Sequence, residues 1–221
     1  HRDMNAQIVS RMAVERDLRR AIANKELSVF YQPQVDIGTG NIIGAEALIR
    51  WQKPNGEMIP PDRFIPIAEG CGLMRQITAL VLEETIGQCK TWRSAGLFMG
   101  RFSVNLPPTD LKHPDLAPSV LSILSAANLD PSILELEITE GMMIESVDAV
   151  VENLRQIRYS GIGLAIDDFG TGYSSLAYLR RFSVDRVKID RTFIKDMQSN
   201  RDVLAITEAI ISMEHALGLI V

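Results

Sequence analysis

The sequence has few cysteines, no long apolar segment and no excess of positive charge. Cys71 and Cys89 are the only cysteines, too few for a disulfide framework or a structural zinc site. No apolar run approaches the roughly 20 residues that span a bilayer, and the first residues lack the order of a signal peptide. The net charge of -5 argues against binding to DNA, which needs a basic surface. We therefore expect a cytoplasmic domain, either free or as the cytoplasmic part of a membrane-anchored protein.

The composition is that of a folded domain, since 46% of the 221 residues are hydrophobic and can form a sizeable core. The periodicity of Asn5–Asn24 predicts a polar amphipathic helix, so we expect residues 1–26 to connect an upstream domain to a main domain over residues 27–221. Strand patterns over Leu27–Ile37 and Ile42–Trp51 are joined by so few residues that the two strands must be antiparallel.

The rest of the chain alternates between helix-like and strand-like segments. The expected helices are Leu73–Ala95, Leu116–Ala127, Ser146–Ser160 and Asp202–Leu217, and the expected strands are Arg101–Leu106, Leu134–Ile138, Gly163–Ile166 and Arg186–Ile189. Such an alternation favours an α/β fold of the (β/α)8 barrel type, in which the loops after the strands build the active site. An open doubly wound sheet is the alternative.

Acid, amide and amine side chains recur in the strand-like segments, at intervals close to multiples of the roughly 30 residues of one strand-helix-strand unit. They are Glu46, Asn105, Glu137, the pair Asp167-Asp168, and Lys188. This spacing predicts that each polar group caps a different strand.

The chemistry of these groups indicates a metal site. The acids and the amide offer only oxygen donors, which suit Mg2+, Mn2+ or Ca2+ rather than zinc or copper. Clustered carboxylates would repel one another without cations. The adjacent acids Asp167 and Asp168 could serve two ions about 3.5–4 Å apart, the spacing used in the hydrolysis of phosphate esters. Lys188 would add a fixed positive charge beside an attacking water.

Each of these residues also has a structural explanation. Taken singly, Glu46 could be the outward residue of a half-buried strand, and Asn105 could open a turn. Glu137 and Asp167 are harder to explain in that way, because a strand of a parallel sheet is apolar on both faces. The segment Asp168–Gly170 matches a kinase magnesium motif, but the other kinase motifs are absent from the sequence.

Several short motifs occur along the chain in a fixed order. They are Tyr31-Gln32-Pro33, Glu46-Ala47-Leu48-Ile49-Arg50, Asn105-Leu106, Glu137-Ile138-Thr139-Glu140, Asp167-Asp168-Phe169-Gly170-Thr171-Gly172-Tyr173-Ser174-Ser175 and Lys188-Ile189-Asp190. In this combination the chain resembles an EAL domain from Leu27 to its end. The resemblance implies a (β/α)8 barrel with an antiparallel first strand. It also implies hydrolysis of cyclic di-GMP to linear pGpG with Mg2+ or Mn2+. We expect Ca2+ to inhibit, because the larger ion favours a looser geometry than the octahedral site of Mg2+.

The resemblance assigns a role to each motif residue. The metal ligands would be Glu46, Asn105, Glu137, Asp167 and Asp168, and the catalytic residues would be Glu46, Asp167, Asp168 and Lys188, with Lys188 polarising the attacking water. The substrate would be bound by Gln32, Leu48, Arg50 and Asp190, with the guanidinium of Arg50 on a phosphate. Glu140 would order the loop that contains Asp168 and Gly172, which in this family links the metal site to the contacts of a homodimer.

The chain departs from the family at two places. Pro107 stands where the family commonly has Ser, and the chain stops at Val221 before the family's Glu-Gly-Val-Glu and Gln-Gly motifs, although Leu217–Val221 resembles the start of the next strand. We therefore expect the parent protein to be an active phosphodiesterase, and the 221-residue chain alone to be inactive with an incomplete barrel. The alternative is a receptor that binds cyclic di-GMP without cleaving it. The first helix resembles the linkers that follow a diguanylate cyclase (GGDEF) domain, which implies such a domain or a sensory domain upstream.

Overall fold

The strands and helices are divided between two units of the chain. The computed structural model describes residues 2–97, 100–144, 148–171, 182, 184–197 and 199–221. Residues 1–110 and 123–129 form the first unit, and residues 111–122 and 130–221 form the second. Helices α4 (Pro108–Leu111) and α5 (Leu116–Ala127) contain residues of both.

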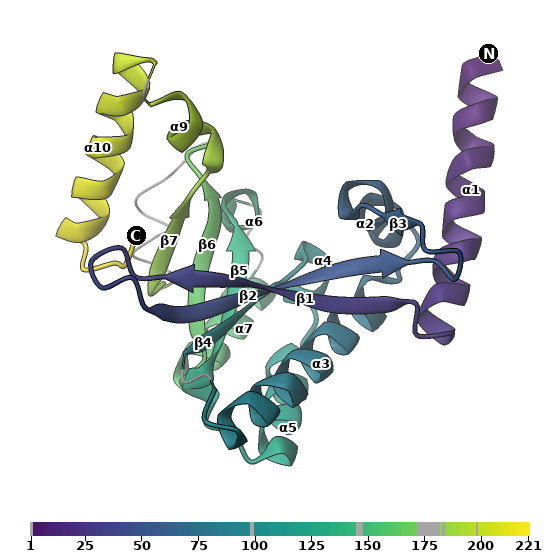
Figure 1. The fold of residues 1–221 in the computed structure, drawn as a ribbon, viewed down its shortest axis with the longest axis horizontal. Coiled ribbons are helices and arrows are strands. Elements are labelled where there is room, and N and C mark those ends of the chain that lie inside the picture. Colours follow the sequence, from purple (N-terminus) through teal and green to yellow (C-terminus); the bar gives the residue numbers. More distant parts are fainter. Residues whose placement is uncertain (1, 98–99, 145–147, 172–181, 183, 198) are drawn as a thin grey trace. The chain divides into compact units, whose positions relative to one another are not determined.

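The first unit combines a long hairpin with a parallel strand and flanking helices (Figure 1). Its elements are α1 (Arg2–Ala23), β1 (Leu27–Val35), β2 (Ile42–Gln52), β3 (Met58–Ile59), α2 (Pro61–Gly70), α3 (Met74–Ser94) and β4 (Arg101–Asn105). Strands β1 and β2 are antiparallel, as predicted, while β4 pairs with β2 in parallel. The turn between β1 and β2 is closed by Asp36, whose Oδ1 accepts a hydrogen bond of 2.7 Å from the backbone N–H of Thr39. Gly40 follows with a positive φ of 71°, which glycine adopts without a steric penalty.

Aromatic side chains and long helices form the core of this unit. Helix α3 packs against β1, β2 and β4, and Trp51 of β2 meets Phe64 of α2 edge to face with 5.6 Å between ring centroids. In α1, Leu18 and Ala21 are fully buried. The end of the expected connector therefore packs as part of the first unit, while the domain boundary at residue 26 stays a prediction.

The second unit is a parallel sheet with helices (Figure 1). Its elements are η1 (Pro131–Ile133), β5 (Leu134–Thr139), α6 (Glu140–Ile144), α7 (Asp148–Tyr159), β6 (Gly163–Phe169), β7 (Arg186–Ile189), α9 (Arg191–Asp196) and α10 (Arg201–Ala216). Strand β6 pairs in parallel with β5 and with β7. Beyond α10, Ile220 forms a parallel bridge with Arg186, at the place where the sequence predicted a further strand.

Ion pairs tie the amino-terminal ends of these strands together. Nε of Arg186 lies 3.3 Å from Oε2 of Glu135, which is almost fully buried. Oδ2 of Asp185 accepts a hydrogen bond of 2.9 Å from the backbone N–H of Leu164 and pairs with the guanidinium of Arg158. These contacts fix the register of β5, β6 and β7 at the ends opposite to the predicted site residues.

Glu214 is a buried acid in α10. Its side chain has no exposed surface, and neither carboxyl oxygen has a hydrogen-bond partner among the described residues. Burial raises the pKa of Glu214 above the ordinary value of a glutamate, because the charged form loses its hydration. When the pKa of a glutamate is higher in the folded state than in the unfolded state, its contribution to stability is fully present at pH values below the unfolded-state pKa. This contribution is lost as the pH rises through the folded-state pKa.

We therefore expect Glu214→Gln to remove part of the pH dependence of stability. At about pH 8 the variant should unfold at a higher urea concentration than the wild type, whereas the two should be similar near pH 4, about the pKa of an unperturbed glutamate. Urea unfolding curves at several pH values measure this. Glu208→Gln, at an exposed position of the same helix, is the matched control and should leave the pH dependence unchanged. Equal midpoints of wild type and Glu214→Gln at about pH 8 would contradict the expectation.

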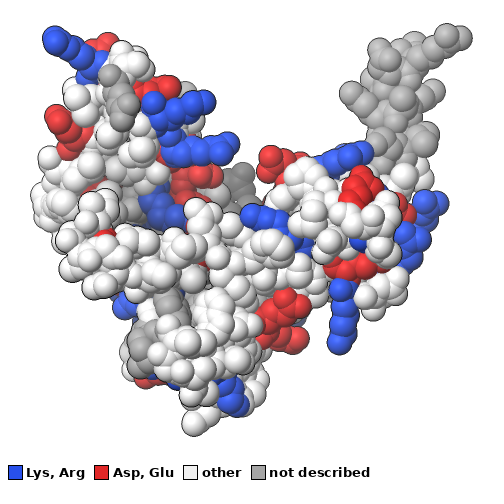
Figure 2. Space-filling view, viewed as in Figure 1, with Lys and Arg blue, Asp and Glu red and all other residues white. Residues whose placement is uncertain are grey.

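The surface carries mixed charges. Figure 2 shows Lys and Arg side chains interspersed with Asp and Glu side chains on the face that it presents, in keeping with the small net charge of -5. In the described part of the chain, no helix is both long enough and apolar enough to cross a membrane.

Candidate active site

In the first unit, Glu46 and Asn105 are held together by neighbouring parallel strands. Glu46 lies in the middle of β2, opposite Gln32 of β1 and Ser103 of β4. Asn105 is the last residue of β4, and its side chain shares a face with that of Ser103 because side chains alternate along a strand. Nδ2 of Asn105 donates a hydrogen bond of 2.9 Å to Oε1 of Glu46. The first unit therefore presents a carboxylate and an amide, both suited to a hard cation.

The predicted substrate-binding residues of β2 lie on the same face of the strand as Glu46. Leu48 and Arg50 follow Glu46 at alternate positions, which places their side chains on one side. Nη1 of Arg50 donates a hydrogen bond of 2.8 Å to the carbonyl oxygen of Ile49. Its Cζ lies 5.9 Å from the ring centroid of Phe30, within reach of a cation–π contact. Phe30 was missed by the sequence analysis, although it stands two positions before Gln32 on β1.

In the second unit, Lys188 joins two of the predicted metal ligands. Nζ of Lys188 lies 2.6 Å from Oε2 of Glu137 and 3.1 Å from Oδ1 of Asp167. The three residues come from β7, β5 and β6, so three neighbouring strands converge on one ammonium group. Glu137 is almost fully buried, whereas Asp167 and Lys188 are each about a fifth exposed.

Asp168 adds a further carboxylate beside this cluster. Its pKa is raised by burial and by the negative charges of Asp167 and Asp190, while Lys188 acts in the opposite direction. Because several acids surround one lysine, the cluster favours a bound cation. Glu137 and Asp167 belong to a group of acids whose oxygens could hold a metal ion. All of the donors are carboxylate or amide oxygens, the set that Mg2+ and Mn2+ accept.

The ends of the strands differ from the prediction. Glu46, Asn105, Glu137 and Lys188 lie within β2, β4, β5 and β7, as the predicted strand bounds imply, and Asn105 is the last residue of its strand. The bound that differs most at the site is that of β6, which was predicted to end at Ile166 and continues through Asp167 and Asp168 to Phe169. The physical reason is the pleat of a strand, which exposes the side chain of Asp168 while that of Phe169 is buried.

Glu140 and Asp190 act on the backbone around the cluster. Glu140 is almost fully buried, and its Oε2 accepts a hydrogen bond of 3.1 Å from the backbone N–H of Gly170. Oδ1 of Asp190 accepts a bond of 2.9 Å from the N–H of Thr192 and another from the Thr192 hydroxyl, which caps α9. These hydrogen bonds lower the pKa of Asp190. The rest of the predicted loop, Gly172 and residues 173–175, lies outside the described residues.

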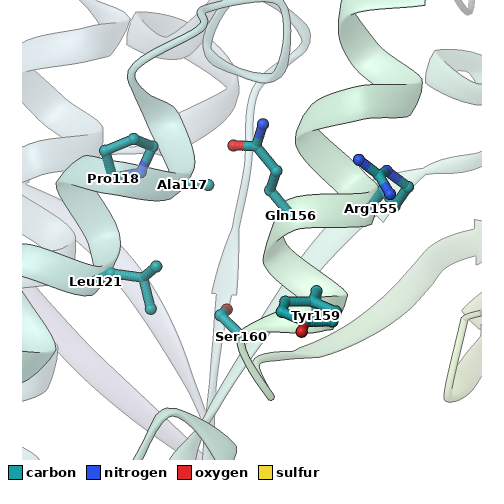
Figure 3. Close-up of a pocket in the computed structure, with 7 residues that line it drawn as sticks. All are labelled: Ala117, Pro118, Leu121, Arg155, Gln156, Tyr159 and Ser160. Carbon is teal, nitrogen blue, oxygen red and sulfur yellow. The ribbon is translucent and has the colours of Figure 1, made fainter.

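A pocket of about 720 Å³ lies elsewhere in the second unit, between α5 and α7. Figure 3 shows its lining, with Ala117, Pro118 and Leu121 from α5, with Arg155, Gln156 and Tyr159 from the end of α7, and with Ser160 directly after that helix. No predicted site residue lines this pocket. The convergent carboxylates, and not this concavity, therefore mark the candidate active site.

Comparison with known proteins gives a family that agrees with this geometry. Residues 15–221 match the EAL domain. The chain is 40% identical over 216 residues to the bifunctional diguanylate cyclase/cyclic di-GMP phosphodiesterase MucR of Pseudomonas aeruginosa, covering 98% of this chain and 32% of MucR. It is 37% identical over 224 residues to the cyclic di-GMP phosphodiesterase NbdA of the same species, covering 97% of this chain and 29% of NbdA. The chain thus spans about a third of the length of these curated relatives.

A solved structure agrees with the sequence relatives. The PaMucR phosphodiesterase in complex with c-di-GMP matches with a TM-score of 0.89 at 40% identity, over 94% of this chain and 84% of that one. The match confirms the predicted (β/α)8 class of fold, with its antiparallel first strand, over the open doubly wound sheet. On its sequence, fold and motifs, the chain belongs to the EAL domain family.

Proposed function

We propose that this chain belongs to the catalytic domain of a metal-dependent phosphodiesterase that hydrolyses cyclic di-GMP to linear pGpG. The observation that carries the proposal is the contact of Lys188 with both Glu137 and Asp167, since a receptor that only binds the dinucleotide has no need of a lysine among carboxylates. The names of MucR and NbdA, and the ligand of the solved PaMucR structure, support this substrate.

In the proposed site, Glu46, Asn105, Glu137, Asp167 and Asp168 would hold one or two divalent ions. Such ions polarise phosphoryl oxygens and lower the pKa of bound water. Arg50, which Phe30 flanks, would bind a phosphate of the dinucleotide, and Gln32 and Leu48 would contact the rest of it. Lys188 would orient the attacking water and offset the negative charge that builds up on the phosphate.

The reaction adds the elements of water across one phosphodiester bond. The water oxygen bonds to phosphorus, the bond from phosphorus to the 3′ oxygen breaks, and the 3′ oxygen takes up a proton. The product keeps a 5′ phosphate and gains a free 3′ hydroxyl, which is linear pGpG. Chromatographic measurement of pGpG from cyclic di-GMP, with the natural protein and Mg2+ or Mn2+, tests the proposal. Tight binding without any pGpG would favour the non-catalytic receptor instead.

Calcium should inhibit the reaction. Ca2+ prefers ligands at about 2.3–2.6 Å in a loose geometry, whereas Mg2+ takes an octahedral arrangement at about 2.0–2.1 Å. We expect full turnover with Mg2+ or Mn2+, none with Ca2+ alone, and recovery when excess Mg2+ is added to the Ca2+ form. Rates of pGpG formation at fixed total ionic strength measure this. Equal rates with Ca2+ and Mg2+ would contradict the proposed dependence on a small hard cation.

A GGDEF or sensory domain would precede the EAL domain in the natural protein. The name of MucR includes a diguanylate cyclase activity, which supports an upstream GGDEF or sensory domain that residues 1–26 would connect to the EAL domain. Leu18 and Ala21, near the end of this connector, are buried within the first unit. We further propose that the domain forms a homodimer, which sedimentation of the natural protein would test.

A further inference from the structure

The backbone from Asp168 to Gly170 adopts an unusual conformation. Asp168 has a φ of 54° and Gly170 a φ of 96°. A non-glycine residue with positive φ is strained, and it persists only where its surroundings over-determine it. Asp168 follows Asp167 directly, so the conformation of this segment sets where two of the proposed metal ligands point.

Hydrogen bonds hold the backbone of this segment from both neighbouring strands' sides. Glu140 accepts the N–H of Gly170, and the N–H of Asp190 donates a bond of 3.3 Å to the carbonyl oxygen of Phe169. The hydroxyl of Thr171 donates a bond of 2.8 Å to the carbonyl oxygen of Asp168. These contacts fix the peptide unit between Phe169 and Gly170, and the φ and ψ torsions of Gly170 then depend on what packs against its α-carbon.

The ring of Phe193 lies against that α-carbon. A methyl group placed on Gly170 would come within 2.7 Å of Cε2 and 2.9 Å of Cζ of Phe193, and within 3.6 Å of Cδ1 of Ile210. Real side chains do not approach so closely, so only glycine fits beneath the ring. The ring of Phe193 therefore packs directly on Gly170 and occupies the position that a side chain would take there.

Phe193 is itself fixed by the element that carries it. The N–H of Phe193 donates a bond of 3.1 Å to the carbonyl oxygen of Asp190, the residue that caps α9. Helix α9 follows β7, which carries Lys188. One continuous segment, β7 followed by α9, thus carries both Lys188 and the ring of Phe193 that packs on Gly170 at the end of β6.

We propose that Phe193 is a positioning residue, which holds Asp167 and Asp168 in place for metal binding by packing its ring on Gly170. The inference rests on the proposed metal-dependent function. Glu140 restrains the backbone of Gly170 through a hydrogen bond, and the ring of Phe193 restrains its α-carbon by contact. Without the ring, Gly170 would have more backbone conformations available, because glycine adopts positive and negative φ almost equally well.

The first test measures metal binding directly in the natural protein, without nucleotide. Phe193→Leu and Phe193→Ala should raise the dissociation constant of Mn2+, measured by calorimetry, by about tenfold or more, a change typical of lost outer-shell support. In hydrolysis, kcat should fall and the Mn2+ requirement should rise, while KM for cyclic di-GMP stays within about twofold. Ile194→Ala, a half-exposed neighbour on the same turn, should change none of these quantities.

The second test asks whether Phe193 acts through Gly170. Gly170→Ala should weaken Mn2+ binding because its methyl group meets the ring, and Phe193→Ala should partly relieve this in the double variant. The two changes should therefore be strongly non-additive. Additive effects would overturn the inference. The inference would also be overturned if the loss of Mn2+ affinity in Phe193→Leu and Phe193→Ala were simply proportional to the loss of Tm. Such a proportion would mean that Phe193 affects metal binding only by stabilising the fold.

The outcomes separate this inference from the proposed function. If the wild type binds Mn2+ but forms no pGpG, the phosphodiesterase proposal fails, and the Mn2+ affinities of the variants still decide the role of Phe193. If the wild type does not bind Mn2+, both proposals are overturned. If hydrolysis requires Mn2+ and Phe193→Leu binds it like the wild type with an unchanged Tm, only the role of Phe193 is overturned.

Discussion

Glu46→Ala should abolish the hydrolysis of cyclic di-GMP by the natural protein. Glu46 supplies the carboxylate of the first unit and is bonded to Asn105, so the substitution removes one proposed ligand and releases another. A catalytic metal ion contributes several kcal/mol of stabilisation to the transition state, and each roughly 1.4 kcal/mol is a tenfold change in rate. We expect turnover to fall by about three orders of magnitude or more at saturating Mg2+.

Two further variants show whether charge or shape matters at this position. Glu46→Gln keeps an oxygen that can accept the hydrogen bond from Asn105 but removes the charge, and it should be almost as inactive as Glu46→Ala. Glu57→Ala, at an exposed acid that pairs with Lys53, should behave like the wild type. Rates of pGpG formation and Tm would be measured for each variant. Normal hydrolysis by Glu46→Ala at saturating Mg2+ would show that the metal assignment is wrong.

Lys188→Ala should lower turnover by two or more orders of magnitude. The loss of one oriented group that stabilises developing charge typically costs about 2.7–4 kcal/mol. The ammonium of Lys188 contacts Glu137 and Asp167, so its removal also leaves these carboxylates without a shared countercharge. The KM for cyclic di-GMP should change much less than kcat, because Lys188 acts on the water and the reacting phosphate.

The comparison of kcat with KM decides between two roles for the lysine. Equal losses in substrate binding and turnover would make Lys188 an anchor for phosphate, and another residue would then have to activate the water. Lys195→Ala, an exposed lysine in the last turn of α9, is the control for a general loss of positive charge. Lys188→Met keeps most of the apolar stem without the ammonium group, and it should be as inactive as Lys188→Ala if charge is what matters.

Much of the fold follows from periodicity and spacing. The helix Leu116–Ala127 and the strand Arg186–Ile189 have the predicted bounds, since their apolar residues follow a clear period between turn residues. The antiparallel pairing of β1 and β2 followed from the shortness of the link alone. In contrast, α2 was not predicted. It begins with Pro61 and contains Pro66, and proline is usually a sign that a helix has ended.

The site was predictable as a set of residues but not as a set of contacts. Motifs pointed to Glu137, Asp167 and Lys188, yet nothing in the sequence places one ammonium between the two carboxylates. The left-handed conformation of Asp168 was equally hidden, because aspartate is found in many conformations. The contact of Phe193 with Gly170 depends on how α9 packs, and packing is decided by tertiary structure rather than by local pattern.

The short turn between β1 and β2 has a consequence for how the site assembles in time. A hairpin forms in about 1–10 μs because its ends are already close, whereas parallel strands must first close a long crossover loop. Gln32 and Glu46 face each other across this hairpin, so the chain should bring them together during an early phase of folding. Glu137, Asp167 and Lys188 lie on strands joined in parallel, and their meeting should wait for a slower phase. The carboxylates of Glu137 and Asp167 should thus come together late in folding. By then the strands that hold them against their mutual repulsion are already formed.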